Sequence, residues 1–215
     1  LEIDHEKGEA RVEPGLVLDQ LNAQLKRHGL FFPVDVSTSS RATLGGMTGN
    51  NSCGARSIRY GKMVDNVLGV EALLQNGEKI QFGEVDPKSL NGKHPSTLDP
   101  LLQQLFQIGI READEVRQRF PEVQRRVGGY NIDELIPPDH GVLNPARLLV
   151  GSEGTLAFST SIHLKLQPIP THKVLGVCHF PSFYEAMDST QHLVTLNPDA
   201  VELVDRTMID LARSI

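Results

Sequence analysis

The stretch that decides the fold is Thr43-Leu44-Gly45-Gly46-Met47-Thr48-Gly49-Asn50-Asn51-Ser52-Cys53-Gly54, which continues to Arg59-Tyr60-Gly61. Its glycines stand among short polar residues, and neither a helical nor a strand period runs through it. Glycine permits positive φ and leaves no Cβ between the backbone and a ligand. The stretch therefore predicts a loop whose successive N–H groups face one point, as in sites for a diphosphate. On glycine content alone, an irregular loop packed against a sheet is the favoured interpretation.

The familiar phosphate and nucleophile motifs are absent from the sequence. Gly49-x-x-x-x-Gly54 is followed by Ala55-Arg56, whereas a Walker loop needs Lys and then Ser or Thr. No G-x-G-x-x-G occurs, so a Rossmann dinucleotide site has no support. The turn Gly151-Ser152-Glu153-Gly154 is not a G-x-S-x-G elbow, and no Ser/His/Asp set stands out.

Regular patterns flank the glycine-rich stretch. Residues 1–13 alternate and predict a hairpin around Lys7-Gly8. The following helix is predicted from Leu18, Leu21 and Leu25 at helical spacing, with Gly29 as its C-terminal cap. Two strand runs, 67–74 and 79–82, are joined by Asn76-Gly77, which is a strong hairpin signal.

The segment from 83 to 166 is predicted from local signals in the same way. Residues 83–100 are polar and predict a surface excursion, after which Asp99-Pro100 begins a helix with Leu101, Leu105 and Ile108 on one face. Charged residues 111–119 predict a solvated helix, and 147–150 predict a short apolar strand. A turn at 151–154 then leads into a long alternating strand that ends near Leu166.

We expect a domain boundary near Pro170, because Pro168 and Pro170 interrupt the chain and a new set of elements follows. That set comprises a strand at 174–180, a helix from the capping box at Ser182 to about Leu196, a strand at 201–204 and a second helix. The domains are thus 1–170 and 171–215. Leu1 lies in an apparent strand and Ile215 in an apparent helix, so we expect a piece of a longer protein.

Composition excludes several classes of protein. Of 215 residues, 39% are hydrophobic and 22% charged, which fits neither a disordered tail nor a membrane span. The formal net charge of −6 argues against a nucleic-acid partner. Cys53 and Cys178 are too few for a disulfide scaffold or a four-cysteine metal site, and they suit the cytoplasm. The scattered histidines form no pair with metal-ligand spacing, so no metal is expected.

A set of segments, in the right order between about Val12 and Pro170, resembles the FAD-linked oxidases and dehydrogenases of the vanillyl-alcohol-oxidase type. Within that superfamily the resemblance is closest to the branch of glycolate oxidase, D-lactate dehydrogenase and D-2-hydroxyglutarate dehydrogenase. The segments are Gly29–Pro33, Asp35, Thr43–Gly46, Asn51–Gly54, Arg59–Gly61, Asp65–Gly69 and Gly151–Leu156. In two places the chain departs from the family pattern: Val36 replaces a proline and Cys53 replaces a glycine.

The resemblance implies an α+β fold: the second subdomain of a PCMH-type FAD-binding domain (1–170), followed by the start of an α+β, ferredoxin-like cap domain (171–215). The family's first glycine-rich diphosphate loop would precede Leu1, which implies weak FAD binding by this chain alone. The residues implied to bind FAD are Pro33, Asp35, Thr43, Leu44, Gly45, Gly46, Gly49, Asn50, Asn51, Ser52, Gly54, Tyr60, Gly61, Glu153, Gly154, Thr155 and Leu156.

The implied activity is oxidation of a D-2-hydroxy acid by hydride transfer to FAD, with an unidentified catalytic base and electron acceptor and with possible homodimer formation. A non-catalytic flavin or nucleotide-binding module and an NADPH-using flavin reductase are the alternatives. Arg125 and Arg126, before Tyr130, are candidates for a substrate carboxylate, although a solvated basic turn explains them equally well. Cys53 is a candidate neighbour of the flavin, although a small buried side chain is the favoured interpretation, and Cys178 is expected in the core. Glu202 is a candidate for the active-site side of the cap.

Overall fold

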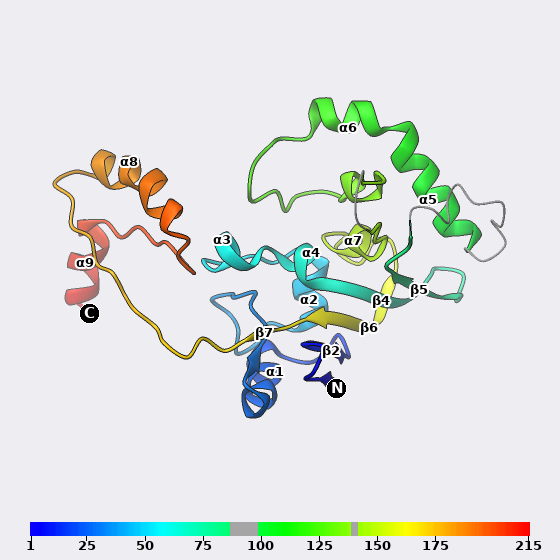
Figure 1. Cartoon of the computed structure of the whole chain (residues 1–215), viewed down its shortest axis with the longest axis horizontal. Helices are drawn as coiled ribbons and strands as arrows, with labels where there is room; N and C mark the ends of the chain where they lie inside the picture. Colours follow the sequence, from blue (N-terminus) through cyan, green and yellow to red (C-terminus); the bar gives the residue numbers. More distant parts are fainter. Residues whose placement is uncertain (87–98, 139–141) are drawn as a thin grey trace.

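An antiparallel sheet organises the protein, whose computed structural model describes residues 1–86, 99–138 and 142–215 (Figure 1). Its five strands lie in the order β1-β2-β6-β4-β5, and a smaller sheet pairs β3 with β7. The prediction for 87–98 lies outside the described residues. The strands are β1 (Glu2–Asp4), β2 (Glu9–Val12), β3 (Leu30–Phe31), β4 (Val67–Leu73), β5 (Lys79–Gly83), β6 (Phe158–Lys165) and β7 (Gln167–Pro168).

The long alternating strand is confirmed as β6, the central strand of the sheet. It pairs with β2 on one side and β4 on the other, so Ile162 stands opposite both Val12 and Val70. The side chains of Ile162 and Leu164 are fully buried. Both predicted hairpins are confirmed as well, β1–β2 and β4–β5, and Gly77 adopts φ +82° in the second turn.

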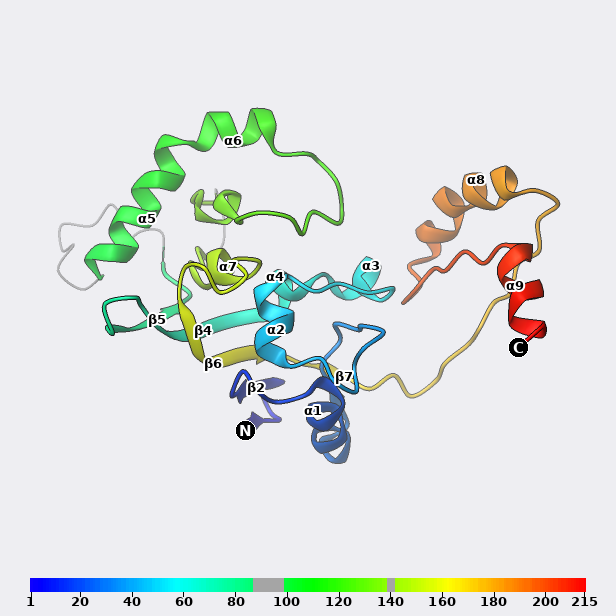
Figure 2. The same cartoon turned by 180° about the vertical axis from the view of Figure 1, so that it is seen from behind.

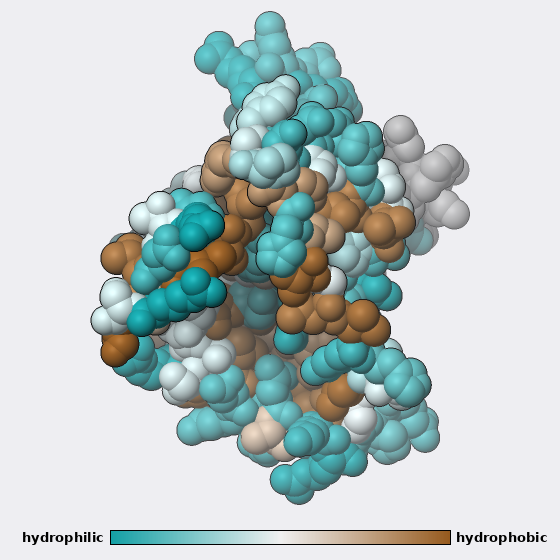
Figure 3. All heavy atoms as spheres, turned by 90° about the vertical axis from the view of Figure 1, so that its left-hand side faces the viewer, coloured by the Kyte–Doolittle hydropathy of each residue, from teal (hydrophilic) through white to brown (hydrophobic). Residues whose placement is uncertain are grey.

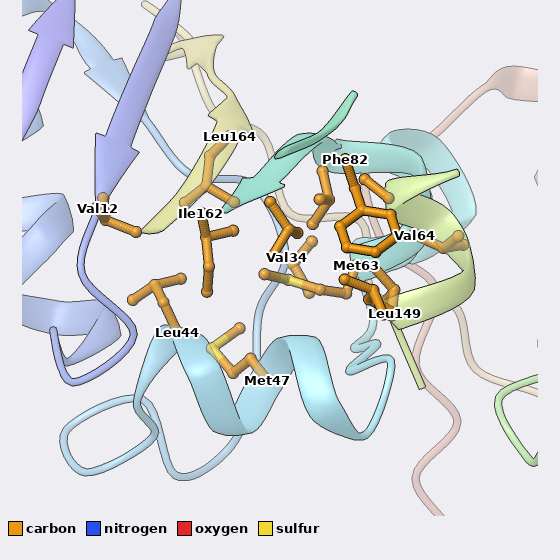
Figure 4. Packing of buried hydrophobic residues seen from close by; sticks show 14 of the residues in the cluster. Val12, Val34, Leu44, Met47, Met63, Val64, Phe82, Leu149, Ile162 and Leu164 are labelled. Atoms are coloured by element: carbon orange, nitrogen blue, oxygen red, sulfur yellow. The ribbon is translucent and has the colours of Figure 1, made fainter. Parts of the chain in front are cut away.

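The core lies between this sheet and short helices (Figure 4). Helix α1 (Leu18–Leu25) buries Leu18, Leu21 and Leu25 as predicted, and a 3-10 turn, η1 (Lys26–His28), ends at Gly29 with φ +69°. In Figure 4 the side chains of Leu44 and Met47 rise from α2 (Leu44–Gly49) toward Ile162 and Met63. Burial of these apolar side chains is the main stabilising contribution.

Two secondary-structure predictions are wrong because tertiary packing and capping override the local pattern. The stretch 43–61 contains α2 and α3 (Ser57–Tyr60), and α4 (Met63–Asn66) follows it. Helix α2 forms because Leu44 and Met47 are buried one turn apart and the Thr43 side chain caps it. Residues 147–150, predicted as a strand, belong mostly to α7 (Ala146–Leu149), where Asn144 Oδ1 accepts from the Ala146 N–H at 3.0 Å.

Two consecutive helices pack against the 3-10 turn η4 (Ile132–Leu135). Helix α5 (Pro100–Arg111) begins as predicted, with the Asp99 side chain accepting from the Leu101 N–H at 2.8 Å, and α6 (Ala113–Arg119) is confirmed too. The buried face of α5 is Leu102, Phe106 and Gly109, which is one position along from the predicted face. Gly109 permits close contact with η4 (Ile132–Leu135), because a Cβ there would lie 2.2 Å from the Leu135 carbonyl oxygen.

The C-terminal segment forms helices but no sheet (Figure 2). Helix α8 (Phe183–Leu193) starts at the predicted Ser182 cap, η5 (Val194–Leu196) extends it, and α9 (Arg206–Arg213) is capped by Asp205. The strands predicted at 174–180 and 201–204 are wrong, because no strand among the described residues pairs with them. Cys178, expected in the core, is exposed.

Apolar side chains lie open on the face that carries α8 and α9 (Figure 3). Val174 is 95% exposed, and none of residues 171–215 is buried. Exposure on this scale is typical of surfaces that bind another chain or domain. Among the described residues, no helix has the length and apolar character needed to cross a membrane.

Candidate functional site

A cavity of about 780 Å³ lies beside α2 and is the candidate site. Its volume falls within the range of small-molecule binding sites. The walls come from the turn after β3, from α2 with its flanking residues, and from one residue of the C-terminal segment. The lining residues are Asp35, Val36, Ser37, Thr38, Ala42, Thr43, Gly46, Met47, Asn50, Ser52, Cys53, Gly54, Ala55 and Glu202.

Helix α2 positions one wall of the cavity but does not offer a row of free amides. The N–H groups of Leu44 and Gly45 donate to the carbonyls of Leu16 and Pro14, both at 2.8 Å. The Gly46 N–H donates to Thr43 Oγ1 at 3.2 Å. The prediction that successive N–H groups of this stretch face one point is therefore wrong for residues 44–46, because folding has already satisfied these donors.

The turn after α2 contains both paired and free backbone donors. Two of its N–H groups are paired: that of Gly54 donates to Ser57 Oγ at 3.0 Å, and that of Arg56 donates to Asp35 Oδ1 at 3.1 Å. Within the described part of the chain, the N–H groups of Cys53 and Ala55 donate to no protein acceptor. Both residues line the cavity, so their unpaired amides are candidates to serve an anionic ligand.

The polar groups of the cavity are mostly neutral. The hydroxyls of Ser37 and Thr38 and the amide of Asn50 line it, while Asp35 and Glu202 supply its carboxylates. Neutral amides and hydroxyls can hold a phosphate, and carboxylates are strong acceptors for sugar hydroxyls. A ligand that contains both phosphate and sugar groups therefore fits the chemistry of these walls.

The turn predicted as a second cofactor segment packs against the carboxyl end of α2. The Glu153 N–H donates to the Gly49 carbonyl and the Gly151 N–H to the Thr48 carbonyl, both at 2.9 Å. Glu153 and Gly154 adopt φ +52° and +70°. The residues Glu153, Gly154, Thr155 and Leu156 do not belong to the lining of the cavity.

The predicted residues divide into those that line the cavity and those that build its frame. Asp35, Thr43, Gly46, Asn50, Ser52 and Gly54 line it; Pro33, Leu44, Gly45, Gly49, Asn51, Tyr60 and Gly61 do not. Pro33, Leu44 and Asn51 are buried. The lining residues that sequence reasoning missed are Val36, Ser37, Thr38, Ala42, Met47, Cys53 and Ala55. The serines that follow Pro-x-Asp in the resembling family could have indicated Ser37.

Glycines in this region serve different purposes. A Cβ on Gly45 would lie 2.6 Å from Pro14 Cβ, and one on Gly54 would lie 2.1 Å from the Asp35 carbonyl oxygen. These two glycines permit close packing of the backbone. A Cβ on Gly46 would meet Thr43 Oγ1 alone within 4 Å, at 3.2 Å, so this position is open toward the cavity.

Asn51 stabilises the turn after α2 without lining the cavity. Its φ is +52°, and its Oδ1 accepts from the Val64 N–H at 3.0 Å. Its Nδ2 is buried without a hydrogen-bond partner among the described residues. A buried donor without a partner is uncommon in folded proteins, and so is a positive φ at a residue other than glycine, so both features mark Asn51 as an exceptional position in this turn.

The basic residues near the site are engaged in contacts of their own. Arg126, a candidate for a substrate carboxylate, pairs with Asp133 and lies 4.6 Å over the Phe120 ring. Arg125 donates to the Gly54 carbonyl at 2.9 Å. Burial, with the Asp199 carboxylate as a second cause, raises the pKa of the Tyr60 phenol above its ordinary value. Within the described residues, no group of His, Cys, Asp and Glu could hold a metal ion.

The geometry agrees with what a family comparison finds. Residues 1–83, which include most of the cavity, match the family model of the FAD binding domain. FAD, which joins a diphosphate to a ribityl chain and a ribose, has the groups that the walls of the cavity can bind.

Similar proteins align with nearly the whole chain. The chain is 35% identical to D-2-hydroxyglutarate dehydrogenase of Escherichia coli, over 99% of this chain and 21% of that protein. It is 30% identical to the mitochondrial D-lactate dehydrogenase [cytochrome] of Arabidopsis thaliana, over 92% of this chain and 26% of that protein. The chain thus spans about one fifth to one quarter of the length of these relatives.

A solved structure supports the fold. Alkyldihydroxyacetonephosphate synthase superposes with a TM-score of 0.55 at 18% identity, covering 93% of this chain and 27% of that one. At this identity the likeness bears on the fold alone. The predicted α+β class is confirmed, with an antiparallel sheet and helices packed on it.

Proposed function

We propose that this chain is the FAD-binding part of a flavin-dependent dehydrogenase that oxidises a D-2-hydroxy acid. The observation that carries the proposal is the cavity beside α2, where several residues implied to bind FAD meet two free backbone amides. The names of the relatives, D-2-hydroxyglutarate dehydrogenase and D-lactate dehydrogenase, support the class of substrate. Of these, the higher identity to the first favours D-2-hydroxyglutarate.

The role of this chain is to bind and orient the cofactor. When bound, FAD supplies the ring that accepts a hydride from the α-carbon of the hydroxy acid. The N–H groups of Cys53 and Ala55 and the hydroxyls of Ser37 and Thr38 would hold the diphosphate, and Asp35 would accept from a sugar hydroxyl. The remaining predicted residues would act through the frame: those of the 153–156 turn by supporting α2, and Tyr60 and Gly61 by shaping α3.

The proposed domains are the FAD-binding domain at 1–170 and the start of a substrate-binding cap at 171–215. Support comes from the residues after Pro170, none of which joins the core. The exposed apolar side chains there, such as Leu175 at 87% and Tyr184 at 77%, favour a homodimer. We place the protein in the cytoplasm, which suits its unpaired cysteines.

Anaerobic reduction tests the proposal. The full-length protein is loaded with FAD, and D-2-hydroxyglutarate, D-lactate, glycolate and NADPH are added in separate cuvettes, with the L enantiomers of the first two acids as controls. We expect loss of the visible flavin absorbance with a D-hydroxy acid. Bound flavin that none of these acids reduces would favour a non-catalytic module, and reduction by NADPH would favour a reductase.

A further inference from the structure

The loop between η5 and α9 contacts the body of the molecule at α3. Both views place this loop beside α3 (Figures 1 and 2). Arg59 Nη1 lies 2.9 Å from Asp199 Oδ1 and donates to the Asn197 carbonyl at 3.4 Å. The Tyr60 hydroxyl donates to the same Asp199 oxygen at 3.3 Å. Two neighbouring side chains of α3 therefore hold one carboxylate of the C-terminal segment.

The same loop completes the wall of the cavity. Glu202, three residues after Asp199, is the one lining residue that comes from beyond residue 55. The segment before α8, residues 171–181, forms neither helix nor strand, so it does not fix the position of the loop. The position of Glu202 at the cavity therefore depends on the contacts of Asp199 and Asn197 with α3.

Arg59 and Tyr60, which hold Asp199, belong to the body of the fold. The Tyr60 ring packs edge-on against Phe31 of β3, with ring centroids 5.7 Å apart. The Arg56 guanidinium lies 5.7 Å from the centroid of the same Phe31 ring. Gly61, at φ +76°, ends α3 directly after Tyr60. Arg59 and Tyr60 thus stand on a support that does not need the C-terminal segment.

The ion pair is suited to reversible contact. The side chains of Arg59 and Asp199 are 43% and 46% exposed. Exposed ion pairs of this kind contribute little to stability, because water solvates both partners well when they separate. A weak pair can break and form without a change in the rest of the fold.

We propose that Arg59, Tyr60 and Asp199 form a clasp that holds residues 197–202 across the mouth of the cavity and so limits entry to it. When the clasp opens, Glu202 leaves the wall and the cavity becomes more accessible to a bulky solute. The clasp does not depend on which ligand the cavity binds, so it stands or falls separately from the proposed function.

Cys53 provides a probe for the test, because it lines the cavity and is partly buried. The background variant is Cys178→Ser, which removes the exposed thiol. The rate at which Cys53 reacts with a bulky aromatic disulfide reagent then measures access to the cavity, without any flavin present. We expect Arg59→Asp and Asp199→Arg each to raise this rate about two- to fivefold, the range that an exposed pair can produce.

A matched control uses the pair of Arg11 and Glu71 on the sheet, 3.6 Å apart and similarly exposed. We expect Arg11→Asp to leave the labelling rate unchanged. The double variant Arg59→Asp/Asp199→Arg should restore the slow rate, and Arg59→Gln should give an intermediate one. Circular dichroism verifies that each variant is folded. Unchanged labelling in both charge reversals, or fast labelling that persists in the double variant, would overturn the clasp.

Discussion

Replacement of Gly46 by valine adds side-chain volume to the wall of the cavity at a position that the fold leaves open. A Cβ there meets Thr43 Oγ1 at 3.2 Å and nothing else within 4 Å. The neighbouring Gly45 offers a matched control, because a Cβ on it would lie 2.6 Å from Pro14 Cβ and 3.0 Å from the Pro14 carbonyl oxygen. The two substitutions are chemically identical and adjacent in the same helix, yet we expect one to lower stability and the other to weaken FAD binding.

For Gly45→Val the effect falls on stability. The added side chain must displace the Pro14 backbone, and overpacking of this kind costs about 1–3 kcal/mol. At about 2–4 °C per kcal/mol for a chain of this size, Tm should fall by roughly 2–12 °C.

For Gly46→Val the effect falls on binding. Replacing a glycine inside a helix stabilises the helix, and this gain offsets the cost of the small shift that the valine requires of Thr43. The free energy of unfolding should therefore change by less than about 1 kcal/mol. The valine methyl groups would occupy space beside Asn50 and Thr43 that the cofactor needs. We expect the Kd for FAD to rise at least about tenfold, or ~1.4 kcal/mol.

Flavin fluorescence titration measures Kd, and thermal unfolding followed by circular dichroism measures Tm, for both variants and the parent protein. An unchanged Kd in Gly46→Val would refute the assignment of this cavity to FAD. An unchanged Tm in Gly45→Val would refute the packing argument for that glycine. Because the two outcomes are independent, one can fail while the other stands.

Three further predictions concern stability. Asn144→Ala should cost about 2–4 kcal/mol in urea unfolding, since the buried amide donates to the Leu68 carbonyl at 3.0 Å and its oxygen caps α7. Asp99→Ala should cost about 1 kcal/mol through loss of the α5 cap, with Glu84→Ala as a surface control that leaves Tm unchanged. Burial raises the pKa of Tyr60 above 10.0, so the folded state holds this proton more tightly than the unfolded state. The protonated phenol therefore contributes fully to the free energy of unfolding below pH 10.0, and this contribution declines as the pH rises through the raised pKa. In urea unfolding, Tyr60→Phe should remove this part of the loss of stability at alkaline pH.

Local signals in the sequence predict the elements whose cause is local. Asn76-Gly77 predicts the β4–β5 hairpin, and the Asp99 and Ser182 caps predict the starts of α5 and α8, because turns and caps depend on a few adjacent residues. The failures come from tertiary packing or from an ambiguous local pattern. Helix α2 forms because the core buries Leu44 and Met47, and the apolar run 147–150 is too short to distinguish helix from strand.

The candidate site shows the same division. Asp35, Thr43 and Gly46 could be named from the resemblance to a family, because its motifs carry them. The free amides of Cys53 and Ala55 could not be predicted, because their freedom depends on which other donors and acceptors folding has paired. Glu202 reaches the cavity from a distant segment, a contact that no local pattern specifies.

The central claim, that the cavity beside α2 binds the diphosphate of FAD, is tested most directly by amide NMR spectroscopy. The measurement is a titration of the isotope-labelled protein with FAD, followed through the backbone N–H signals. We predict that Cys53 and Ala55 shift most strongly and toward lower field, because their free N–H groups gain a charged acceptor. Signals of Leu101 and Leu105 on α5, which lie at a separate apolar cavity, should stay in place. Shifts confined to α5, with Cys53 and Ala55 unmoved at saturating FAD, would contradict the claim.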